Sequence, residues 1–458
     1  MRILNQTSWS ESGEASKINL RSILRLSMPF SVLIFCAAFN WSYVEWISPV
    51  WGYGGLTYKS PNPALLIFGY VLAGTLCAFS PLRIRRSSQA IYWILYFTVF
   101  IPGLFVPLFL QLDNDLTLLL MQLSMTSGML LIALSYRMPL LRFQLYPVRP
   151  RLFWTVFFIV FVLCNAILLL AFRNNLHLAS LKEVYEVRFR SRQVSQEYSG
   201  INYVSNVLNY VINPFLIAYG LYSKRRMLIA LGSAGQIFIY ATAALKSVLF
   251  GPVLVVALYY SLRKDRGGWA AKMGLLFAGL FFFLTTFVIG AKPGILFNLA
   301  TVTLVRSFAM PGSFIGLYEH FFENFPHTYL SHVTGINLLI HSPYQLSTGM
   351  EISTFYSGGG GEFGPAQENA SFFAMDGIAG FGLPGIPIIC ILCAAVFWVL
   401  DCCTRKYPIA FSASALTMCT ISLTNSSLFS TLVSSGLLAW MLLFTFLPRH
   451  FLEMDSNV

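Results

Sequence analysis

Charged residues are scarce in this chain. They make up 10% of its 458 residues, whereas apolar residues make up 56% and the mean hydropathy is +0.67. A water-soluble domain of this length needs more polar side chains to cover its surface. Hydrophobic runs long enough to cross about 30 Å of hydrocarbon recur between residues 27 and 447. The composition therefore excludes a soluble globular protein and predicts an integral membrane protein.

Cysteines are absent from the segments where an external disulfide would form. All eight lie inside apolar runs or at run ends that we assign to the cytoplasm. Cys390 and Cys393 have the spacing of a redox motif, but their apolar surroundings favour small core side chains. No cleavage pattern of small residues follows the first apolar run, so we expect a retained first span.

Motifs of several other functional classes are also missing. The six histidines have neither HExxH spacing nor cysteine neighbours, so we expect no zinc site, and we predict no cofactor. Residues 358–361 are four glycines without the strand and helix context of a phosphate loop. The net charge of +12 comes from short basic clusters between apolar runs, which indicates membrane topology rather than nucleic-acid binding.

The apolar runs predict an all-α polytopic membrane protein with about twelve transmembrane helices. With the N-terminus in the cytoplasm, 21 of the 30 Lys and Arg residues lie inside, and both termini are cytoplasmic. The expected helices are 27–47, 63–80, 90–111, 116–136, 152–172, 201–222, 227–244, 247–262, 273–291, 386–401, 409–425 and 429–447.

This order of helices divides the chain into five parts. We expect a cytoplasmic segment 1–26, helices one to nine over 27–291, a large external loop 292–385, helices ten to twelve over 386–447, and a cytoplasmic tail 448–458. A second, shorter external loop is 173–200. Within the large loop, Pro311 and Gly312 predict the start of an amphipathic helix that ends at Phe325 and lies at the membrane interface.

The shorter external loop carries a cluster of cations. If residues 178–193 form a helix, Tyr185, Arg188 and Arg192 share one face, and Arg190 lies between the two arginines. Planar guanidinium groups bind phosphate through two parallel hydrogen bonds. The cluster is a candidate phosphate site, and the alternative is a solvated helix whose arginines contact lipid headgroups.

A few polar residues interrupt the apolar runs. A charge at the bilayer centre costs roughly 2.5–3.5 kcal/mol, so each should lie near an interface or face a polar cavity. Lys246 stands between two short helices, where it can face an external cavity or extend to the interface. The polar residues are Glu45, Asn209, Asn213, Lys246 and Asp401.

Four stretches resemble the O-antigen polymerase family, whose members polymerise oligosaccharide repeat units. They are VRFRSR (187–192), LKSVLFGP (245–252), LVRSFAMPGSFIGLYEHFF (304–322) and QENASFFAMDGIAGFGLPGI (367–386). The resemblance implies a GT-C-like fold in the bacterial inner membrane, with an active site that faces the periplasm. It implies transfer of a glycan from undecaprenyl pyrophosphate to the non-reducing end of another lipid-linked repeat unit. The expected partners are this lipid-linked oligosaccharide, membrane lipid and a chain-length-regulating co-polymerase, without nucleic acid.

The implied reaction assigns roles to the external polar residues. A departing pyrophosphate needs cations at the outer leaflet, for which the candidates are Arg188, Arg190, Arg192, Lys246 and Arg306. The acceptor hydroxyl needs a general base, for which His332, His341, Glu368 and Asp376 all remain open. Tyr185 and Asn369 are further candidates for substrate binding.

Two other functions remain open at this stage. An O-antigen ligase would use the same donor and a different acceptor, and the sequence separates the two poorly. A flippase or polysaccharide transporter should carry charges deep in several spans, whereas most charges here gather in the loops.

Overall fold

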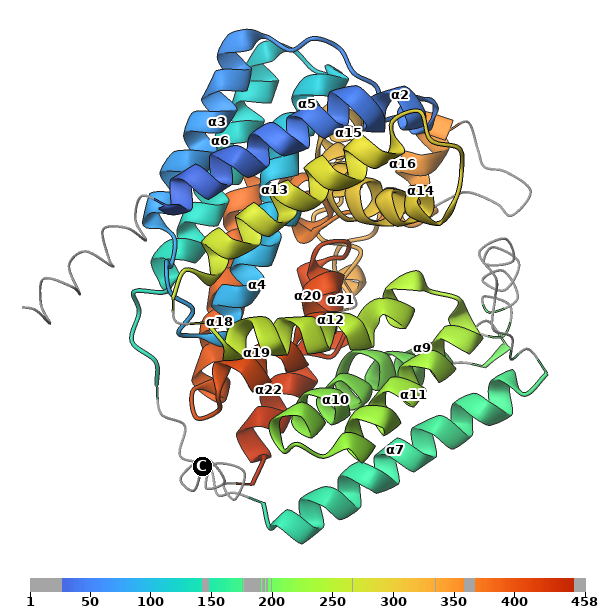
Figure 1. The fold of residues 1–458 in the computed structure, drawn as a ribbon. Helices are drawn as coiled ribbons and strands as arrows, with labels where there is room; N and C mark the ends of the chain where they lie inside the picture. The colour runs from blue at the N-terminus through green and yellow to red at the C-terminus, as the bar shows by residue number, and fades with distance from the viewer. Residues whose placement is uncertain are drawn as a thin grey trace, which may run out of the picture. The chain divides into compact units, whose positions relative to one another are not determined.

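The computed structural model describes residues 27–141, 148–174, 176, 191, 194, 197–198, 200–265, 267–333, 335–357 and 367–448. Within these residues the secondary structure is helical, without a strand (Figure 1). Ten of the described helices are long and apolar enough to cross a membrane, and Pro63–Phe79 is a shorter apolar helix. The prediction of an all-helical polytopic membrane protein is thus confirmed. The ten are Ser27–Gly54, Ser87–Leu110, Asp115–Ser135, Pro150–Phe172, Ile201–Tyr222, Lys246–Arg263, Trp269–Val288, Ile295–Asn324, Gly385–Thr404 and Leu428–Phe446.

The predicted number of spans differs from this set in four places. The expected helix 63–80 forms as Pro63–Phe79, which is too short to be among the ten. The helix α11 (Arg226–Ala243) forms where we expected it but is not among the ten. The expected helix 409–425 is broken at Leu416 into α19 (Ile409–Ala415) and α20 (Thr417–Leu423). The helix Ile295–Asn324 lies where we expected the start of the large external loop. A count of twelve therefore remains a prediction.

The long helix Ile295–Asn324 consists of α14 (Ile295–Ala300), η5 (Thr301–Ala309) and α15 (Met310–Asn324). The prediction that Pro311 starts a helix is wrong, because the helix already begins at Ile295. Pro311 is accommodated inside it, directly after the wide π-helical turns of η5.

The same arrangement recurs along the chain. A proline has no N–H, and its ring clashes with the carbonyl four residues earlier. A wide π-helical turn before the proline is one way in which a helix can continue through it. Four π-helical segments end two residues before a proline: η1 (Tyr43–Ile47) before Pro49, η3 (Tyr96–Phe100) before Pro102, η4 (Leu208–Ile212) before Pro214, and η5 before Pro311.

Polar residues are placed in several of these wide turns. Glu45 lies in η1, Asn209 in η4 and Arg306 in η5. A fifth π-helical segment, η7 (Phe373–Ile378), contains Asp376. Single π turns inside α-helices are frequent at functional sites, so these positions are the first to consider for chemistry.

The chain divides into two compact units, and each is described by itself. The first contains Met1–Ile84, Phe97–Leu134 and Asp265–Gly316. In it, α3 (Pro63–Phe79) packs against α5 (Ile101–Leu110), and α13 (Trp269–Val288) against α14. Its core contains edge-to-face phenylalanines, with Phe281 5.6 Å from Phe35 and 5.0 Å from Phe308 between ring centroids.

The second unit contains Arg85–Tyr96, Ser135–Lys264 and Leu317–Val458. Here α10 (Asn213–Tyr222) packs against α11 and α19, and α12 (Lys246–Arg263) also packs against α19 (Figure 1). The helix α18 (Gly385–Thr404) packs against η7, α4 (Ser87–Leu95) and α22 (Leu437–Phe446).

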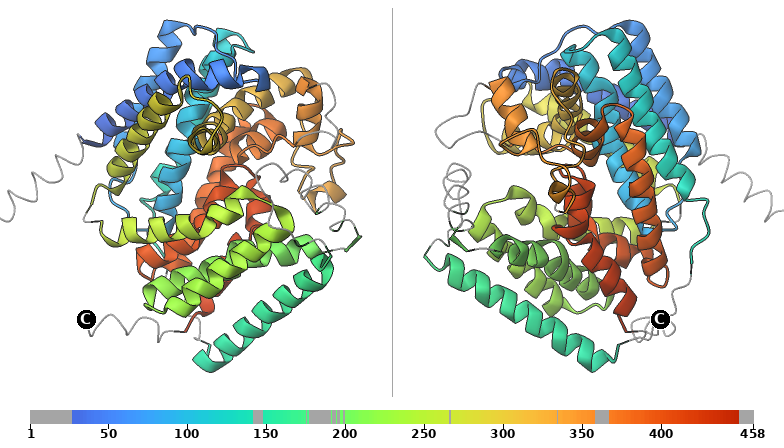
Figure 2. Two further views of the ribbon diagram at one scale, coloured as in Figure 1. Left: turned by 45° about the vertical axis from the view of Figure 1, so that its right-hand side comes forward. Right: turned by 180° about the vertical axis from the view of Figure 1, so that it is seen from behind.

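One helix of the second unit presents most of its apolar surface outward. The helix α7 (Pro150–Phe172) lies at the edge of this unit in both views of Figure 2 and contacts α9 (Ile201–Val207). Leu163, Ile167 and Leu170 are each at least 45% exposed. Such a surface suits contact with lipid, in agreement with a membrane protein.

Asp401 shows how one of the polar interruptions is accommodated. It is 1% exposed in α18, and its carboxylate accepts hydrogen bonds from the N–H (3.0 Å) and the hydroxyl (2.7 Å) of Ser88. Ser88 lies in the first turn of α4, where N–H groups have no partner within the helix. Asp401 therefore anchors the start of α4 instead of facing a polar cavity.

Candidate functional site

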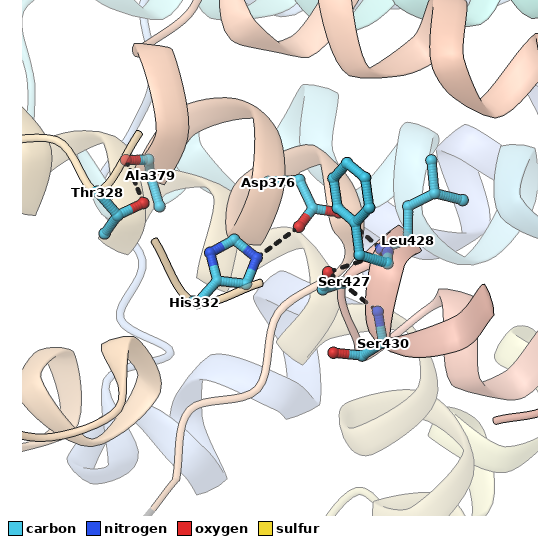
Figure 3. A network of polar contacts seen from close by, with 8 residues as sticks. Thr328, His332, Asp376, Ala379, Ser427, Leu428 and Ser430 are labelled. Atoms are coloured by element: carbon cyan, nitrogen blue, oxygen red, sulfur yellow. Dashed lines mark hydrogen bonds and ion pairs between the residues drawn. The ribbon is translucent and has the colours of Figure 1, made fainter. Parts of the chain in front are cut away.

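Asp376 and His332 form a buried polar pair in the second unit. The Asp376 side chain is fully buried in η7, and its Oδ1 lies 2.8 Å from Nε2 of His332. Its Oδ2 accepts the backbone N–H of Leu428 at 2.6 Å (Figure 3). Both residues were candidate general bases, and the structure brings them together.

The N–H of Leu428 is available because it begins a helix. In α21 (Leu428–Val433), the hydroxyl of the N-cap residue Ser427 accepts the N–H groups of Phe429 and Ser430. The Leu428 N–H is a further donor at this end, and Asp376 accepts it. The carboxylate is thus held from one side by a helix N-terminus and from the other by an imidazole.

A strained turn places His332 beside Asp376. Tyr329 (φ 48°) and Leu330 (φ 63°) both adopt left-handed backbone conformations, which are rare for bulky residues. Thr328 fastens this turn, because its N–H and its hydroxyl both bond to the Ala379 carbonyl, at 2.7 Å and 3.0 Å. Strained backbone that persists is held by its surroundings and is common at functional sites.

The bonds of the pair leave one imidazole nitrogen open. A carboxylate only accepts hydrogen bonds, so Nε2 of His332 carries a hydrogen, and in the neutral imidazole Nδ1 then has the lone pair. Nδ1 is buried and has no hydrogen-bond partner among the described residues. The His332 side chain as a whole is 16% exposed. An imidazole oriented by a carboxylate can accept a proton from a hydroxyl group.

Further polar atoms in the same segments are also unpartnered. Within the described part of the chain, Nδ1 of His327 and the hydroxyls of Ser331 and Ser371 are buried without a hydrogen bond. Buried polar groups are nearly always paired, so unpaired groups of this kind indicate room for a ligand or water. They come from the two segments that carry His332 and Asp376.

His327 differs from His332 in its environment. Its ring stacks on Phe322, with centroids 5.7 Å apart. Burial lowers the pKa of His327, and a hydrogen bond to the Ile378 backbone opposes this effect only in part. His327 is therefore neutral near pH 7 and can act as a hydrogen-bonding group rather than as a cation.

The other predicted site residues are placed as follows. Among the remaining candidate bases, His341 is exposed and Glu368 is half-buried. The Glu368 backbone donates to the Gly349 carbonyl (3.1 Å) and accepts from the Tyr318 hydroxyl (2.9 Å). Asn369 is half-buried beside it, and Lys246 is half-buried at the first position of α12.

The predicted cations are only partly placed. Arg306 lies in η5 of the first unit and is exposed, with no bonded partner among the described residues. Tyr185, Arg188, Arg190 and Arg192 lie outside the described residues, so their grouping remains a prediction.

Sequence reasoning missed the residues that support the pair. Thr328, His327 and the N-terminus of α21 were not among the candidates. Ser427 before an apolar run is a recognisable helix start. That signal locates an N–H donor, but it does not reveal which carboxylate the donor meets.

Compared with known proteins, the chain matches no family model, no curated protein and no solved structure. The fold and the site define an all-helical polytopic membrane protein with a buried Asp and His pair. Any more specific activity is therefore a proposal.

Proposed function

We propose that the protein is a membrane glycosyltransferase that polymerises lipid-linked oligosaccharide repeat units. Its donor and acceptor would both be oligosaccharides on undecaprenyl pyrophosphate, at the periplasmic face of a bacterial inner membrane. The proposal joins the O-antigen polymerase resemblance of four sequence stretches to the chemistry of the His332 and Asp376 pair.

The observation that carries the proposal is the open Nδ1 of an imidazole held by a buried carboxylate. Asp376 keeps the imidazole in one tautomer and stabilises the imidazolium that forms when a proton arrives. Of the four candidate bases, His332 thus takes the role of general base, and Asp376 becomes its positioning residue. One of the four resembling stretches, 367–386, contains Asp376.

The proposed reaction is a displacement at the anomeric carbon of the donor sugar. The acceptor hydroxyl oxygen bonds to this carbon, and its proton passes to Nδ1 of His332. The bond from the anomeric carbon to the pyrophosphate oxygen breaks, and the electron pair leaves with the pyrophosphate. Cations are needed to stabilise this leaving charge, and the sequence-based candidates Arg188, Arg190, Arg192 and Arg306 are proposed for that role from the sequence alone.

The test is deletion of the gene followed by complementation. We expect the deletion strain to carry surface glycan of single repeat units. Complementation with His332→Gln should leave this defect, because Gln can still donate to Asp376 but is not a base. A loss of about 10²–10⁴-fold in polymerisation is expected. The exposed Gln345→Ala variant is the control and should restore full chain length.

Other outcomes would contradict the proposal. Unattached full-length polymer in the deletion strain would indicate a ligase, and glycan accumulated in the cytoplasm would indicate a flippase. Normal chain length from a His332→Gln variant of normal membrane abundance would show that the pair is structural.

A further inference from the structure

A second polar cluster lies in the second unit, between the helix Ile201–Tyr222 and α11. It consists of three amide side chains: Asn209 and Asn213, four residues apart on one helix, and Gln236 on α11. They are 3%, 0% and 1% exposed, respectively. The sequence analysis singled out both asparagines as interruptions of an apolar run, and the proposed function does not use them.

Pro214 explains why Gln236 points into this cluster. The Asn213 N–H donates to the Leu208 carbonyl, five residues earlier. In this π-helical register the donor for the Asn209 carbonyl would be residue 214, which is a proline without N–H. Nε2 of Gln236 donates to that carbonyl instead, at 2.8 Å. The orientation of the Gln236 amide is thereby determined, and its Oε1 is an acceptor.

The cluster contains more acceptors than donors. Oδ1 of Asn209, Oδ1 of Asn213 and Oε1 of Gln236 are all buried without a hydrogen-bond partner among the described residues. Among the described residues, Nδ2 of Asn213 is a donor in this cluster that is likewise buried without a partner. A buried unpaired polar atom costs about 1–3 kcal/mol, so a ligand that gave these oxygens a partner would stabilise the folded protein.

The space around these oxygens is small. A methyl group placed on Gly235 would lie 2.4 Å from Oδ1 of Asn213, and one on Gly251 would lie 3.7 Å from Nε2 of Gln236. Glycines at these positions let α11 and α12 approach the amides closely. The site therefore fits a single small ion better than an organic molecule.

We propose that Asn209, Asn213 and Gln236 bind a sodium ion. The amide oxygens are hard ligands, which suit a cation of this kind. They are also uncharged, whereas divalent cations are commonly held by carboxylates. Among the described residues, no carboxylate forms a hydrogen bond with the three amides.

The experiment measures sodium binding directly on the full-length protein in nanodiscs. We expect saturable binding of radioactive sodium at one ion per chain, in a scintillation proximity assay. Replacement of choline by sodium at constant ionic strength should raise the apparent Tm by about 3 °C or more. Potassium should give a smaller shift.

Variants make the assignment specific. Asn213→Leu removes an unpartnered amide, so it should fold in choline and lose both the sodium binding and the Tm shift. Gln236→Glu should bind sodium more tightly, by about tenfold or more, because a carboxylate replaces a neutral ligand. Asn165→Leu is the matched control, since Asn165 lies in α7 and bonds to the Phe161 carbonyl (2.8 Å). It should retain the sodium effect.

Two results would overturn the proposal. Equal Tm values in sodium and choline, with no bound radioactive sodium, would show that the amides hold buried water. Sodium binding that persists in both Asn213→Leu and Gln236→Leu would place the ion elsewhere. Neither readout depends on a glycosyltransferase activity, so failure of this proposal is distinguishable from failure of the proposed function.

Discussion

The carboxylate of Asp376 and the backbone N–H of Leu428 lie 2.6 Å apart, although 52 residues of chain separate them. This bond joins a π-helical segment to the first residue of α21. The second carboxylate oxygen holds His332, so one buried side chain connects three separate segments.

Loss of this carboxylate should therefore destabilise the protein. Asp376→Ala leaves the Leu428 N–H and Nε2 of His332 without an acceptor. We expect the free energy of unfolding to fall by about 1–3 kcal/mol. The free energy of unfolding is measured by tryptophan fluorescence during denaturant unfolding in detergent. Asp115→Ala is the control, because exposed Asp115 also accepts a hydrogen bond, from Asn62 (2.8 Å), and should change stability by less than about 0.5 kcal/mol. Equal losses in both variants would contradict the connecting role.

The backbone next to Asp376 depends on a glycine. A methyl group on Gly385 would lie 2.1 Å from the Gly377 carbonyl oxygen, so Gly385→Ala must separate α18 from η7. We expect a loss of about 1–3 kcal/mol in stability together with reduced activity. Gly279→Ala in α13 meets no atom within 4 Å and should be neutral. A stable and active Gly385→Ala variant would show that the contact relaxes without consequence. Thermal unfolding of both variants makes the comparison.

His327 should contribute to the pH dependence of stability. Its pKa in the folded protein is below the ordinary value of 6.5 for histidine, so the unfolded chain binds more protons in this range. The contribution of neutral His327 to the stability of the folded protein is complete above pH 6.5. It is lost as the pH falls through the lowered pKa of His327. His327→Phe preserves the stacking on Phe322 and should flatten the decline in Tm on the acid side. Tm measured between about pH 7.5 and 5 tests this. An unchanged slope in the His327→Phe variant would contradict the prediction.

Arg306 is expected to serve the proposed reaction rather than the fold. It is exposed, and the described residues supply no bonded partner for its guanidinium. Arg306→Ala should reduce polymer formation by about 10²–10³-fold at unchanged membrane abundance. Arg306→Lys should restore only part of the polymer formation, because lysine cannot make the two parallel hydrogen bonds to phosphate that a guanidinium group makes. Full-length polysaccharide from a normally abundant Ala variant would exclude the role. Chain length is read by gel electrophoresis of the surface glycan.

The helix Ile295–Asn324 should not carry the chain across the membrane, although its length and composition allow it. A full crossing would place exposed Arg306 near the middle of the bilayer, where insertion of a charged side chain costs roughly 2.5–3.5 kcal/mol. It would also reverse the direction of the later helices and so place Arg405 and Lys406 on the external side. We expect single cysteines at Lys292 and Gln345, both exposed, to react with an impermeant thiol reagent in intact cells. The native cysteines are buried, except for half-buried Cys164, and give low background. Reaction at only one of the two positions would show a crossing.

The sequence alone was sufficient to predict the membrane class and most helix positions. Apolar runs and basic clusters are local signals, and the free energy of placing a side chain in lipid depends mainly on that side chain and its depth. The wide turns are also local in origin, because each of four proline-associated π segments ends two residues before its proline. Pro311 alone is also typical of a helix start, and only the π segment before it shows that the helix has already begun.

The pairing of polar residues was decided only by tertiary structure. His332 and Asp376 were two of four candidate general bases. They are 44 residues apart, and no sequence pattern indicates that their side chains form a hydrogen bond. The same holds for Asp401 with Ser88 and for Gln236 with the Asn209 carbonyl. A polar group can be buried at low cost only if it has a hydrogen-bond partner. The sequence shows which polar groups in apolar segments need such a partner. Which partner each of them has depends on how helices distant in sequence pack together.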